Sequence, residues 1–302
     1  MELQTKFAII IPTYNRPNKI KKAIRSVIQQ TFFNWEIYIV DDCSDVPYSS
    51  EIWEDIKDKV KYYRLDKNRG HCYARNFALQ QIENGVWVKY LDDDDEILPT
   101  CLENLNDFIE KNPDVDVIST NYIKRFDTYE KVCETNYYKY SVFSGKLDTC
   151  AICHKKDLYE QIGGWDERLY RMADDDFFFN YISNGNYGYC NVVTSVFYDT
   201  SDEDRVTNIC SNLKYCNIIA EKYDYFKNNR CLVLTNNEGN IMDENYNIES
   251  FMPFDVSNTI KKGYKYIVKY DKNDSLNDIF QKKYHSEKLP IRVGNSVLIK
   301  GV

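Results

Sequence analysis

The amino-acid sequence predicts an α/β fold with a mostly parallel sheet and helices on both faces, followed by a small C-terminal α+β appendage. Short apolar runs rich in β-branched residues alternate with segments whose apolar residues recur at helical spacing, as in successive βαβ units. Polar residues follow the ends of these runs, where the carboxyl edge of an open α/β sheet binds ligands. The 302 residues can form one large domain, or a domain of about 200 residues with an appendage.

The N-terminal part of the chain predicts the order strand, helix, strand, loop, strand, helix, strand, helix, strand. Each expected helix carries one apolar stripe, which indicates burial of a single face. No glycine-rich phosphate loop follows the first strand, so Rossmann-type cofactor binding and Walker-type ATP binding are disfavoured. Strands are expected at residues 7–11, 35–40, 60–65, 87–91 and 115–120, and helices at 20–28, 74–82 and 102–109.

The C-terminal part is less regular. Beyond residue 127 a tyrosine-rich stretch is expected to be antiparallel or loop-like, and helical spacing returns at 177–182. We expect a main domain over residues 1–230 that ends in a helix at about 204–227. Residues 231–302 form the appendage, in which residues 264–270 alternate as in a half-exposed strand.

Four consecutive aspartates, Asp92–Asp95, follow the buried strand expected at 87–91. In an extended chain Asp92 and Asp94 project to the same side, at a spacing that suits one hard divalent cation, which could in turn hold a diphosphate. A solvated charged face is the simpler explanation, but surface runs seldom sit directly on a buried strand. An acidic N-terminus for the helix beginning near Thr100 is compatible with metal binding.

An EF-hand calcium loop is a further alternative for this run. The acids Asp92, Asp94, Glu96 and Glu103 fall at loop positions 1, 3, 5 and 12. Position 6 is Ile97, however, where the sharp turn of that loop needs glycine. The sequence therefore disfavours an EF-hand.

A second acidic cluster, Asp174–Asp176, lies at the N-terminus of the helix expected around 177–182. Acids at a helix N-terminus are stabilised by the helix dipole, which is a complete structural explanation. Three in a row exceed what capping needs, and mutual repulsion would raise one pKa toward the working range of a general base.

Charge and composition limit the partners and the compartment. The 39 basic and 47 acidic residues give a net charge of −8, which argues against general nucleic-acid binding. Lys261–Arg292 is locally basic, and forms either a solvated surface or a docking face for an anionic acceptor or a membrane. The chain opens on a short polar leader before the first strand, so we expect no signal peptide, and we find no stretch long enough to span a bilayer. Ten cysteines without regular spacing then predict reduced thiols in the cytoplasm, with peripheral contact at the inner face of a membrane as a hypothesis.

Five segments together resemble glycosyltransferase family 2, whose nucleotide-sugar transferase fold is called GT-A. They occur in the family's order and spacing, over roughly residues 5–205. The resemblance implies a nucleotide-sugar half at about 1–125 and an acceptor half at about 126–205. The segments are Ile9–Arg16; Val40–Asp45; Asn68–Gly70 with Ala74–Asn76; Leu91–Asp95 with Pro99; and Gly163–Glu167.

The resemblance assigns the donor side to residues at the strand ends. Asp92 and Asp94 match the family's DxD element, in which Asp92 faces the ribose or the metal and Asp94 binds the metal directly. Mn²⁺ or Mg²⁺ would bridge the diphosphate of a nucleoside-diphosphate sugar, with a UDP-sugar favoured by family habit. The expected nucleotide-binding set is Thr13, Tyr14, Arg16, Asp42, Asn68, Arg75, Asp92 and Asp93.

The resemblance also assigns the acceptor side. Asp174 matches the catalytic base of an inverting reaction, which takes the proton of the acceptor hydroxyl. The family usually shows Glu-Asp where this chain has Ala173-Asp174, so Asp175 is the reserve candidate. Trp165 and Asp166 would shape the acceptor pocket. The chain lacks the Gln-x-x-Arg-Trp motif of the processive branch, so we expect one sugar or a few to be added to a saccharide, lipid-linked or protein acceptor.

Two other functions compete with this interpretation. A sugar-phosphate nucleotidyltransferase uses a related sheet, but such enzymes tend to have a glycine-rich loop where this chain has Pro12–Asn15. A catalytically dead carbohydrate-binding scaffold would keep the fold, but Asp92, Asp94 and Asp174 are intact.

Overall fold

The computed structural model describes residues 5–135 and 148–199, Lys222, and four strands nearer the C-terminus. Its internal contacts group the chain into two units. The first comprises residues 1–136 and 146–204, and the second comprises residues 137–145 and 205–302.

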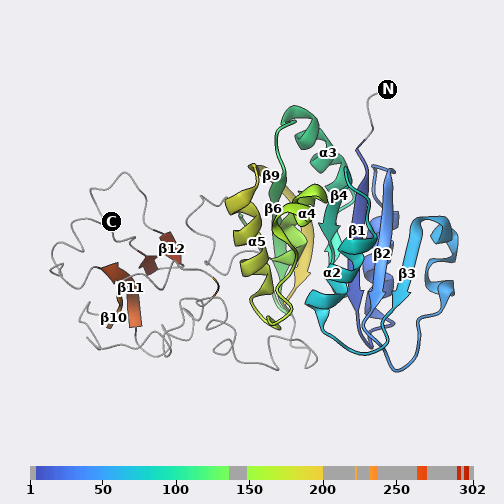
Figure 1. Ribbon diagram of the computed structural model, residues 1–302, viewed down its shortest axis with the longest axis horizontal. Helices are drawn as coiled ribbons and strands as arrows, with labels where there is room; N and C mark the ends of the chain where they lie inside the picture. Colours follow the sequence, from blue (N-terminus) through green and yellow to red (C-terminus); the bar gives the residue numbers. More distant parts are fainter. Residues whose placement is uncertain are drawn as a thin grey trace. The chain divides into compact units, whose positions relative to one another are not determined.

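The first unit is built on a nine-stranded mixed sheet with the order β3-β2-β1-β4-β8-β6-β9-β5, and β7 pairs with β6 at its side (Figure 1). β1 to β4 run parallel, and β6 and β9 also run parallel, whereas β8 is antiparallel to both β4 and β6. The predicted α/β class with a mostly parallel sheet is therefore confirmed. The strands are β1 (Phe7–Thr13), β2 (Trp35–Asp41), β3 (Val60–Arg64), β4 (Trp87–Tyr90), β5 (Glu96–Ile97), β6 (Val117–Arg125), β7 (Glu130–Cys133), β8 (Ile152–Lys155) and β9 (Tyr187–Tyr198).

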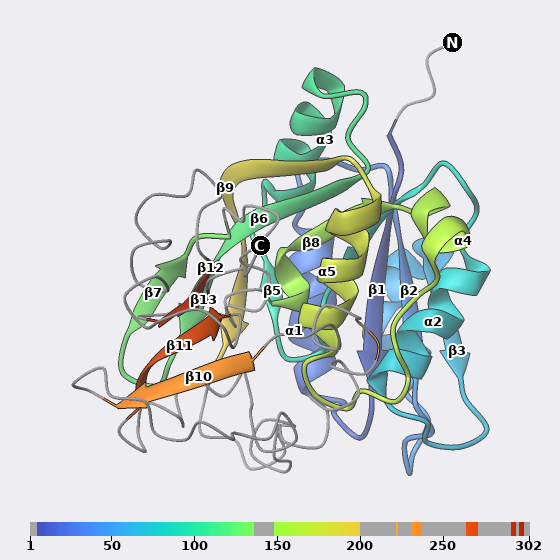
Figure 2. The same ribbon diagram turned by 60° about the vertical axis from the view of Figure 1, so that its left-hand side comes forward.

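Helices cover both faces of this sheet, as predicted (Figure 2). Apolar residues of α1 and α3 share one core with the odd-numbered residues of β1 and β2. On the opposite face α2 contacts β1 and β2, and α5 packs on β4. The helices are α1 (Lys19–Ile28), α2 (His71–Gln81), α3 (Cys101–Lys111), α4 (Asp157–Ile162) and α5 (Ala173–Asn184), with 3₁₀ turns η1 (Ser50–Lys59) and η2 (Thr149–Ala151).

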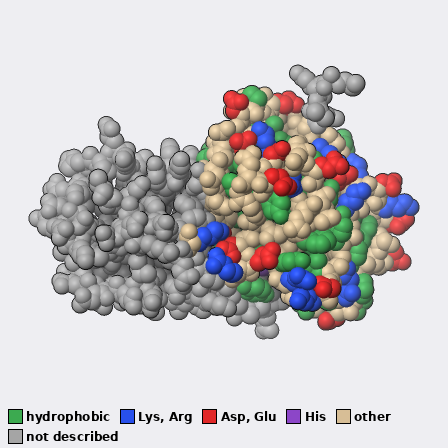
Figure 3. All heavy atoms as spheres, in the orientation of Figure 1, with side chains coloured by type: hydrophobic (Ala, Val, Ile, Leu, Met, Phe, Trp, Pro, Cys, Tyr) green, Lys and Arg blue, Asp and Glu red, His purple; other side chains and the backbone are tan. Residues whose placement is uncertain are grey.

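The predicted apolar stripes are buried with few exceptions. In α1, Ile20, Ile24 and Val27 are at most 1% exposed, whereas Ile28, expected in the same stripe, is 41% exposed because it is the last residue of the helix. On the face drawn in Figure 3, acidic and basic side chains of the described residues are interspersed, so neither sign of charge dominates that face.

A stack of aromatic rings fixes α5 on the sheet. The Phe177 ring lies 4.1 Å from the Trp165 ring at an interplanar angle of 8°, and 3.9 Å from the Tyr181 ring. Tyr90 of β4 meets Phe177 edge-on, and its hydroxyl bonds to Nε2 of His154 at 2.8 Å. Offset and edge-on ring pairs add to the energy of burial, so this stack holds the N-terminus of α5, which carries the second acidic cluster.

The second unit is described only in part. β10 (Cys231–Asn236) pairs antiparallel with β11 (Tyr264–Tyr270), and β12 (Ile291–Val293) pairs antiparallel with β13 (Ser296–Leu298). The strand predicted at 264–270 is therefore confirmed. The helix predicted at 204–227 lies outside the described residues except for Lys222, which is helical, and Lys261–Arg292 lies largely outside them. The boundary predicted near residue 230 and the role of the appendage stay predictions.

Within the parts of the chain that the structure describes, no helix combines the length and the apolar character that crossing a bilayer requires.

Candidate active site

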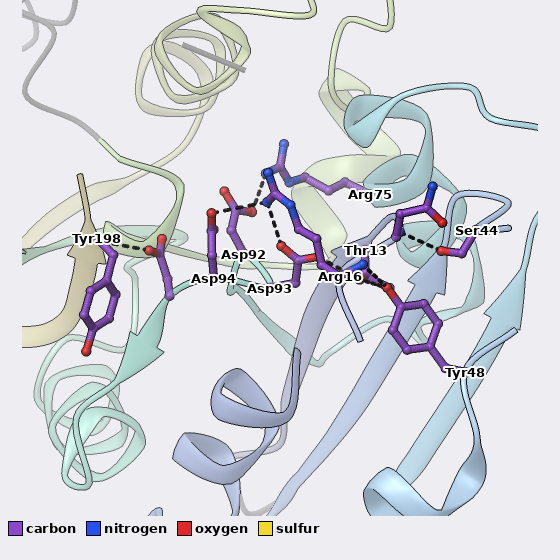
Figure 4. A network of polar contacts seen from close by, with 11 residues as sticks. Thr13, Arg16, Ser44, Tyr48, Arg75, Asp92, Asp93, Asp94 and Tyr198 are labelled. Carbon is purple, nitrogen blue, oxygen red and sulfur yellow. Dashed lines mark hydrogen bonds and ion pairs between the residues drawn. The ribbon is translucent and has the colours of Figure 1, made fainter. Parts of the chain in front are cut away.

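The ends of β1, β2 and β4 bring the predicted donor-side residues together at one edge of the sheet (Figure 4). The parallel register places Thr13 opposite Asp41, and the Asp42 N–H donates to the Thr13 carbonyl at 2.9 Å. The Leu91 N–H donates to the Ile10 carbonyl at 3.0 Å, so the acidic run begins directly beside β1. This is the carboxyl edge at which open α/β sheets bind ligands.

The acidic run forms a turn, which corrects the expectation of an extended chain. The Asp95 N–H donates to the Asp92 carbonyl at 3.1 Å, and β5 begins at Glu96 to pair antiparallel with β9. Asp92 and Asp94 consequently have different arginine partners, although both carboxylates remain partly exposed, at 30% and 19%. The turn arises because the chain must leave β4 and pair with β9 within a few residues.

Arg16 binds the middle of this turn. Its NH1 lies 3.0 Å from Oδ1 of Asp93 and 3.2 Å from Oδ2 of Asp94. The Thr13 hydroxyl donates to Oδ2 of Asp93 at 2.7 Å and accepts from the Tyr48 hydroxyl at 2.7 Å. Burial raises the pKa of Asp93 to about 7, although Arg16 opposes that rise. Thr13 and Asp93 are each 4% exposed, so their hydrogen bond is a buried contact that stabilises the turn after β4.

The loop after β1 is held by the loop after β2. Asn15 has a left-handed backbone, with φ of 55°, and its N–H donates to the Ser44 hydroxyl at 2.9 Å. The Asn15 side chain exchanges two further bonds with Asp45, of 2.8 and 3.1 Å. Asparagine is among the residues that tolerate this conformation best. Tyr14, between these anchored positions and Thr13, presents a ring that is 42% exposed.

Asp42 organises the start of α2. Its two carboxylate oxygens accept from the backbone N–H groups of Arg69 and Gly70, each at 2.7 Å. Burial raises the pKa of Asp42, although these two bonds oppose the rise. Asn68, in the same loop, is exposed. Both predicted residues therefore lie at the same sheet edge as Tyr14, and their contacts with a nucleotide stay predictions.

Arg75 pairs with the first acid of the run. Its NH2 lies 2.5 Å from Oδ1 of Asp92, and its guanidinium stacks 4.5 Å above the Trp165 ring. Burial by itself would raise the pKa of Asp92, but Arg75, together with His71 and Arg16, outweighs burial and the pKa falls. Trp165 is 3% exposed and is fixed by two 2.8 Å bonds between its backbone and the Asn76 side chain. Trp165 thus supports Arg75, and Asp166 binds Arg168 at 2.7 Å. The acceptor contacts predicted for Trp165 and Asp166 stay predictions.

The acids of α5 differ in exposure. Asp174 is half-buried and accepts from the Asp175 N–H at 3.0 Å, whereas Asp175 is 7% exposed and Asp176 fully buried. Among the described residues, Oδ1 of Asp175 has no hydrogen-bond partner. Burial raises the pKa of Asp174, and burial followed by repulsion from Asp174 and Asp176 raises the pKa of Asp175 well above its usual range. The sequence predicted that the pKa of one acid in this cluster would be raised, and this direction is found, but burial rather than mutual repulsion is its first cause.

Asp148, which no sequence motif singled out, joins the two acidic clusters. It lies directly before η2, and its Oδ1 accepts from the Cys150 N–H at 3.1 Å. Burial, followed by the charges of Asp174 and Asp92, raises its pKa to about 7. Asp148 is thus an electrostatic neighbour of acids from both clusters, although Asp92 and Asp174 are about 80 residues apart in the chain. One ligand atom from each of Asp95, Asp148 and Cys150 lies within 4.8 Å of the others.

The donor side suits a hard divalent cation. Asp92 and Asp94 supply partly exposed carboxylates, which Mg²⁺ and Mn²⁺ prefer as ligands. Arg16 and Arg75, which now pair with them, are also groups that recognise phosphate. The residues present therefore fit both a cation and the diphosphate that it would bridge.

Comparisons with known proteins give the family of this chain. The family model for glycosyl transferase family 2 matches residues 8–187. A Haemophilus influenzae protein named an uncharacterized glycosyltransferase is 30% identical over 180 residues, which cover 56% of this chain and 60% of that protein. The putative colanic acid biosynthesis glycosyl transferase WcaA of Escherichia coli is 36% identical over 103 residues, 32% of this chain and 34% of that protein. The matched region spans less than two thirds of the length of these relatives.

Solved structures show the same fold. The crystal structure of S. aureus TarS 1–349 in complex with UDP-GlcNAc has a TM-score of 0.58 at 22% identity, covering 72% of this chain and 66% of that one. The mannosyltransferase PcManGT of Pyrobaculum calidifontis, in complex with GDP-Man and Mn²⁺, has a TM-score of 0.50 at 19% identity, covering 65% and 57%. At these identities the likeness is one of fold.

Proposed function

This chain belongs to glycosyl transferase family 2, and from that premise we propose that it is an inverting, metal-dependent, non-processive enzyme. It transfers a sugar from a nucleoside-diphosphate sugar, with UDP favoured, to a hydroxyl group of a saccharide acceptor. The observation that carries the proposal is that Asp92 and Asp174 both lie close enough to Asp148 to raise its pKa, while Arg75 is bound to Asp92.

On the donor side, the exposed ring of Tyr14 supplies a flat surface for the nucleotide base. Asp42 and Asn68 lie at the same carboxyl edge of the sheet. Thr13 binds Asp93, and Asp93 in turn holds Arg16 at this edge. Asp92 and Asp94 would hold Mn²⁺ or Mg²⁺, which would offset the charge that develops on the leaving diphosphate.

On the acceptor side, Asp174 is the general base. The acceptor oxygen forms a bond to the anomeric carbon while the bond from that carbon to the diphosphate oxygen breaks, and Asp174 takes the hydroxyl proton. A single displacement inverts the anomeric carbon, so an α-linked donor gives a β-linked product. Asp174 is favoured over the buried Asp175 as the base because Asp174 is partly exposed. Burial also raises the pKa of Asp174 toward the range in which a base works.

The names of relatives support a saccharide acceptor. Two of them are named for the biosynthesis of colanic acid and teichuronic acid. Lipid-linked and protein acceptors remain alternatives that the same hydroxyl chemistry allows, and peripheral membrane contact through Lys261–Arg292 is a separate hypothesis.

The test is a panel of nucleotide sugars incubated with the protein and Mn²⁺, with release of free nucleoside diphosphate measured and EDTA as the control. Metal-dependent release from one donor would support the proposal and identify both sugar and base. Titration with UDP and Mn²⁺ separates the alternatives. A dead scaffold should show no metal-dependent binding, and a nucleotidyltransferase should prefer a nucleoside triphosphate.

A further inference from the structure

His71, the first residue of α2, contacts two distant parts of the site. Its Nε2 lies 2.9 Å from the Tyr170 carbonyl oxygen, and its Nδ1 lies 2.6 Å from NH1 of Arg75. A carbonyl oxygen can only accept and an arginine can only donate, so Nε2 carries the hydrogen and Nδ1 accepts. Burial, and then the neighbouring Arg75, lowers the pKa of His71 to about 4, so the ring is neutral near pH 7.

The guanidinium of Arg75 is held by three contacts. Asp92 binds NH2, His71 binds NH1, and the Trp165 ring lies beneath the plane. The Arg75 side chain is 4% exposed, so water cannot readily replace a lost partner. Without His71, NH1 would be a buried donor lacking this acceptor, and the guanidinium could turn away from the orientation that holds Asp92.

The same end of α2 also holds the segment that leads into α5. The Cys72 thiol donates to the Leu169 carbonyl at 3.1 Å, next to the bond between His71 and Tyr170. The His71 and Tyr170 rings lie 5.6 Å apart. Two successive carbonyls are thus fixed a few residues before Asp174.

We propose that His71 is a positioning residue, which orients Asp92 through Arg75 and ties the segment before α5 to the donor side. The proposal rests on the proposed function, because it assigns His71 to the same site. His71 lies between the matching pieces Asn68–Gly70 and Ala74–Asn76, and its role follows from the bonds of its ring to Tyr170 and Arg75.

Two substitutions separate those bonds. H71N places an amide oxygen where Nδ1 lies and keeps the acceptor for Arg75, whereas H71Q places its amide near Nε2 and keeps the bond to Tyr170. H71A removes both. The measurement is titration of UDP in the presence of Mn²⁺, with the thermal midpoint of each variant as the folding control.

We expect H71A and H71Q to weaken metal-dependent UDP binding by about tenfold, the factor expected for one hydrogen bond to a charged group, and H71N to restore most of it. KM for the donor should rise more than kcat falls. Equal binding by wild type and H71A would overturn the role of His71. Weakening of all three variants in proportion to their loss of thermal stability would show a purely structural residue. A wild type that does not bind UDP with Mn²⁺ would overturn the proposed function itself.

The tautomer gives a test that needs no ligand. In ¹⁵N NMR spectra of the wild-type protein, His71 should show a protonated Nε2. His154 is a built-in reference, because its Nδ1 lies 2.8 Å from the Lys155 carbonyl and must therefore be the protonated nitrogen. The signal that disappears in H71N identifies His71, and a protonated Nδ1 there would contradict the bond to Arg75 and overturn the proposal.

Discussion

Replacing Asp174 by asparagine removes one charge from the N-terminus of α5 while keeping the size of the side chain. The asparagine oxygen can still accept from the Asp175 N–H, the bond that is 3.0 Å long in the wild type. Asp175→Asn is the matched control in the same turn. Asp175 is only 7% exposed, and burial raises its pKa well above its usual range, so it is not expected to reach an acceptor hydroxyl.

The two variants should differ in turnover and not in donor binding. Loss of a general base slows a reaction by about 100-fold to 10,000-fold, which is about 3–5 kcal/mol of barrier. Asp174 is repelled by Asp92 and attracted by Arg75. These two effects oppose each other, so we expect UDP affinity in Asp174→Asn to stay within about threefold of wild type. Asp175→Asn should keep turnover within about tenfold, because Asp175 is buried and takes no part in the proposed proton transfer.

The assay compares initial rates of nucleoside diphosphate release at saturating donor and acceptor, with UDP affinity and thermal midpoint measured on the same preparations. Near-normal turnover in Asp174→Asn with an inactive Asp175→Asn would move the base by one residue. Normal turnover in both would direct attention to Asp148, the remaining carboxyl between the clusters. An equal fall of UDP affinity and turnover in Asp174→Asn would place that residue on the donor side.

Three further changes test other parts of the site and its support. Asp94→Ala should abolish the Mn²⁺-dependent heat of UDP titration; unchanged heat would remove Asp94 from the metal ligands. Burial lowers the pKa of His154 to about 4. Unfolding of the wild type therefore takes up a proton below about pH 6.5. In urea unfolding, the wild type should lose about 2 kcal/mol of unfolding free energy between pH 7 and pH 5, and H154Q should not show this loss. Equal pH slopes would show that this histidine is charged when folded. In Gly164→Ala the added methyl would overlap the Asn76 oxygen that binds Trp165, so urea unfolding should show a loss of about 2 kcal/mol, and unaltered stability would mean that Asn76 can move at no cost.

The strands that end in acids could be predicted because their signals are local. An apolar β-branched run followed by Asp92–Asp95 specifies a buried strand and an acidic loop without reference to the rest of the chain. The conformation of that loop could not be predicted in this way. It depends on Glu96 and Ile97 pairing with β9, about 100 residues later, so the turn and the separate partners of Asp92 and Asp94 are set by tertiary structure.

Asp148 and His71 were missed for a related reason. Asp148 stands alone before Cys150, and its neighbours Asp95 and Asp174 are distant in sequence. His71 lies inside a recognised segment, between Gly70 and Arg75, at a position that carries no motif residue. Its significance depends on the Tyr170 carbonyl, and backbone carbonyls leave no trace in a sequence.

The charge of the site explains why a cation and a diphosphate should bind together. Burial and neighbouring carboxylates raise the pKa of Asp93, Asp148 and Asp174, which shows that further negative charge is costly in this site. A diphosphate entering alone would add negative charge to an acidic site, whereas a divalent cation entering first lowers that cost. Coupling between two ligands is reciprocal, so the nucleotide must strengthen cation binding by the same factor as the cation strengthens nucleotide binding. The carboxylates of the site thus disfavour a diphosphate that binds without a metal ion. For the same reason we expect the donor to bind together with its metal ion.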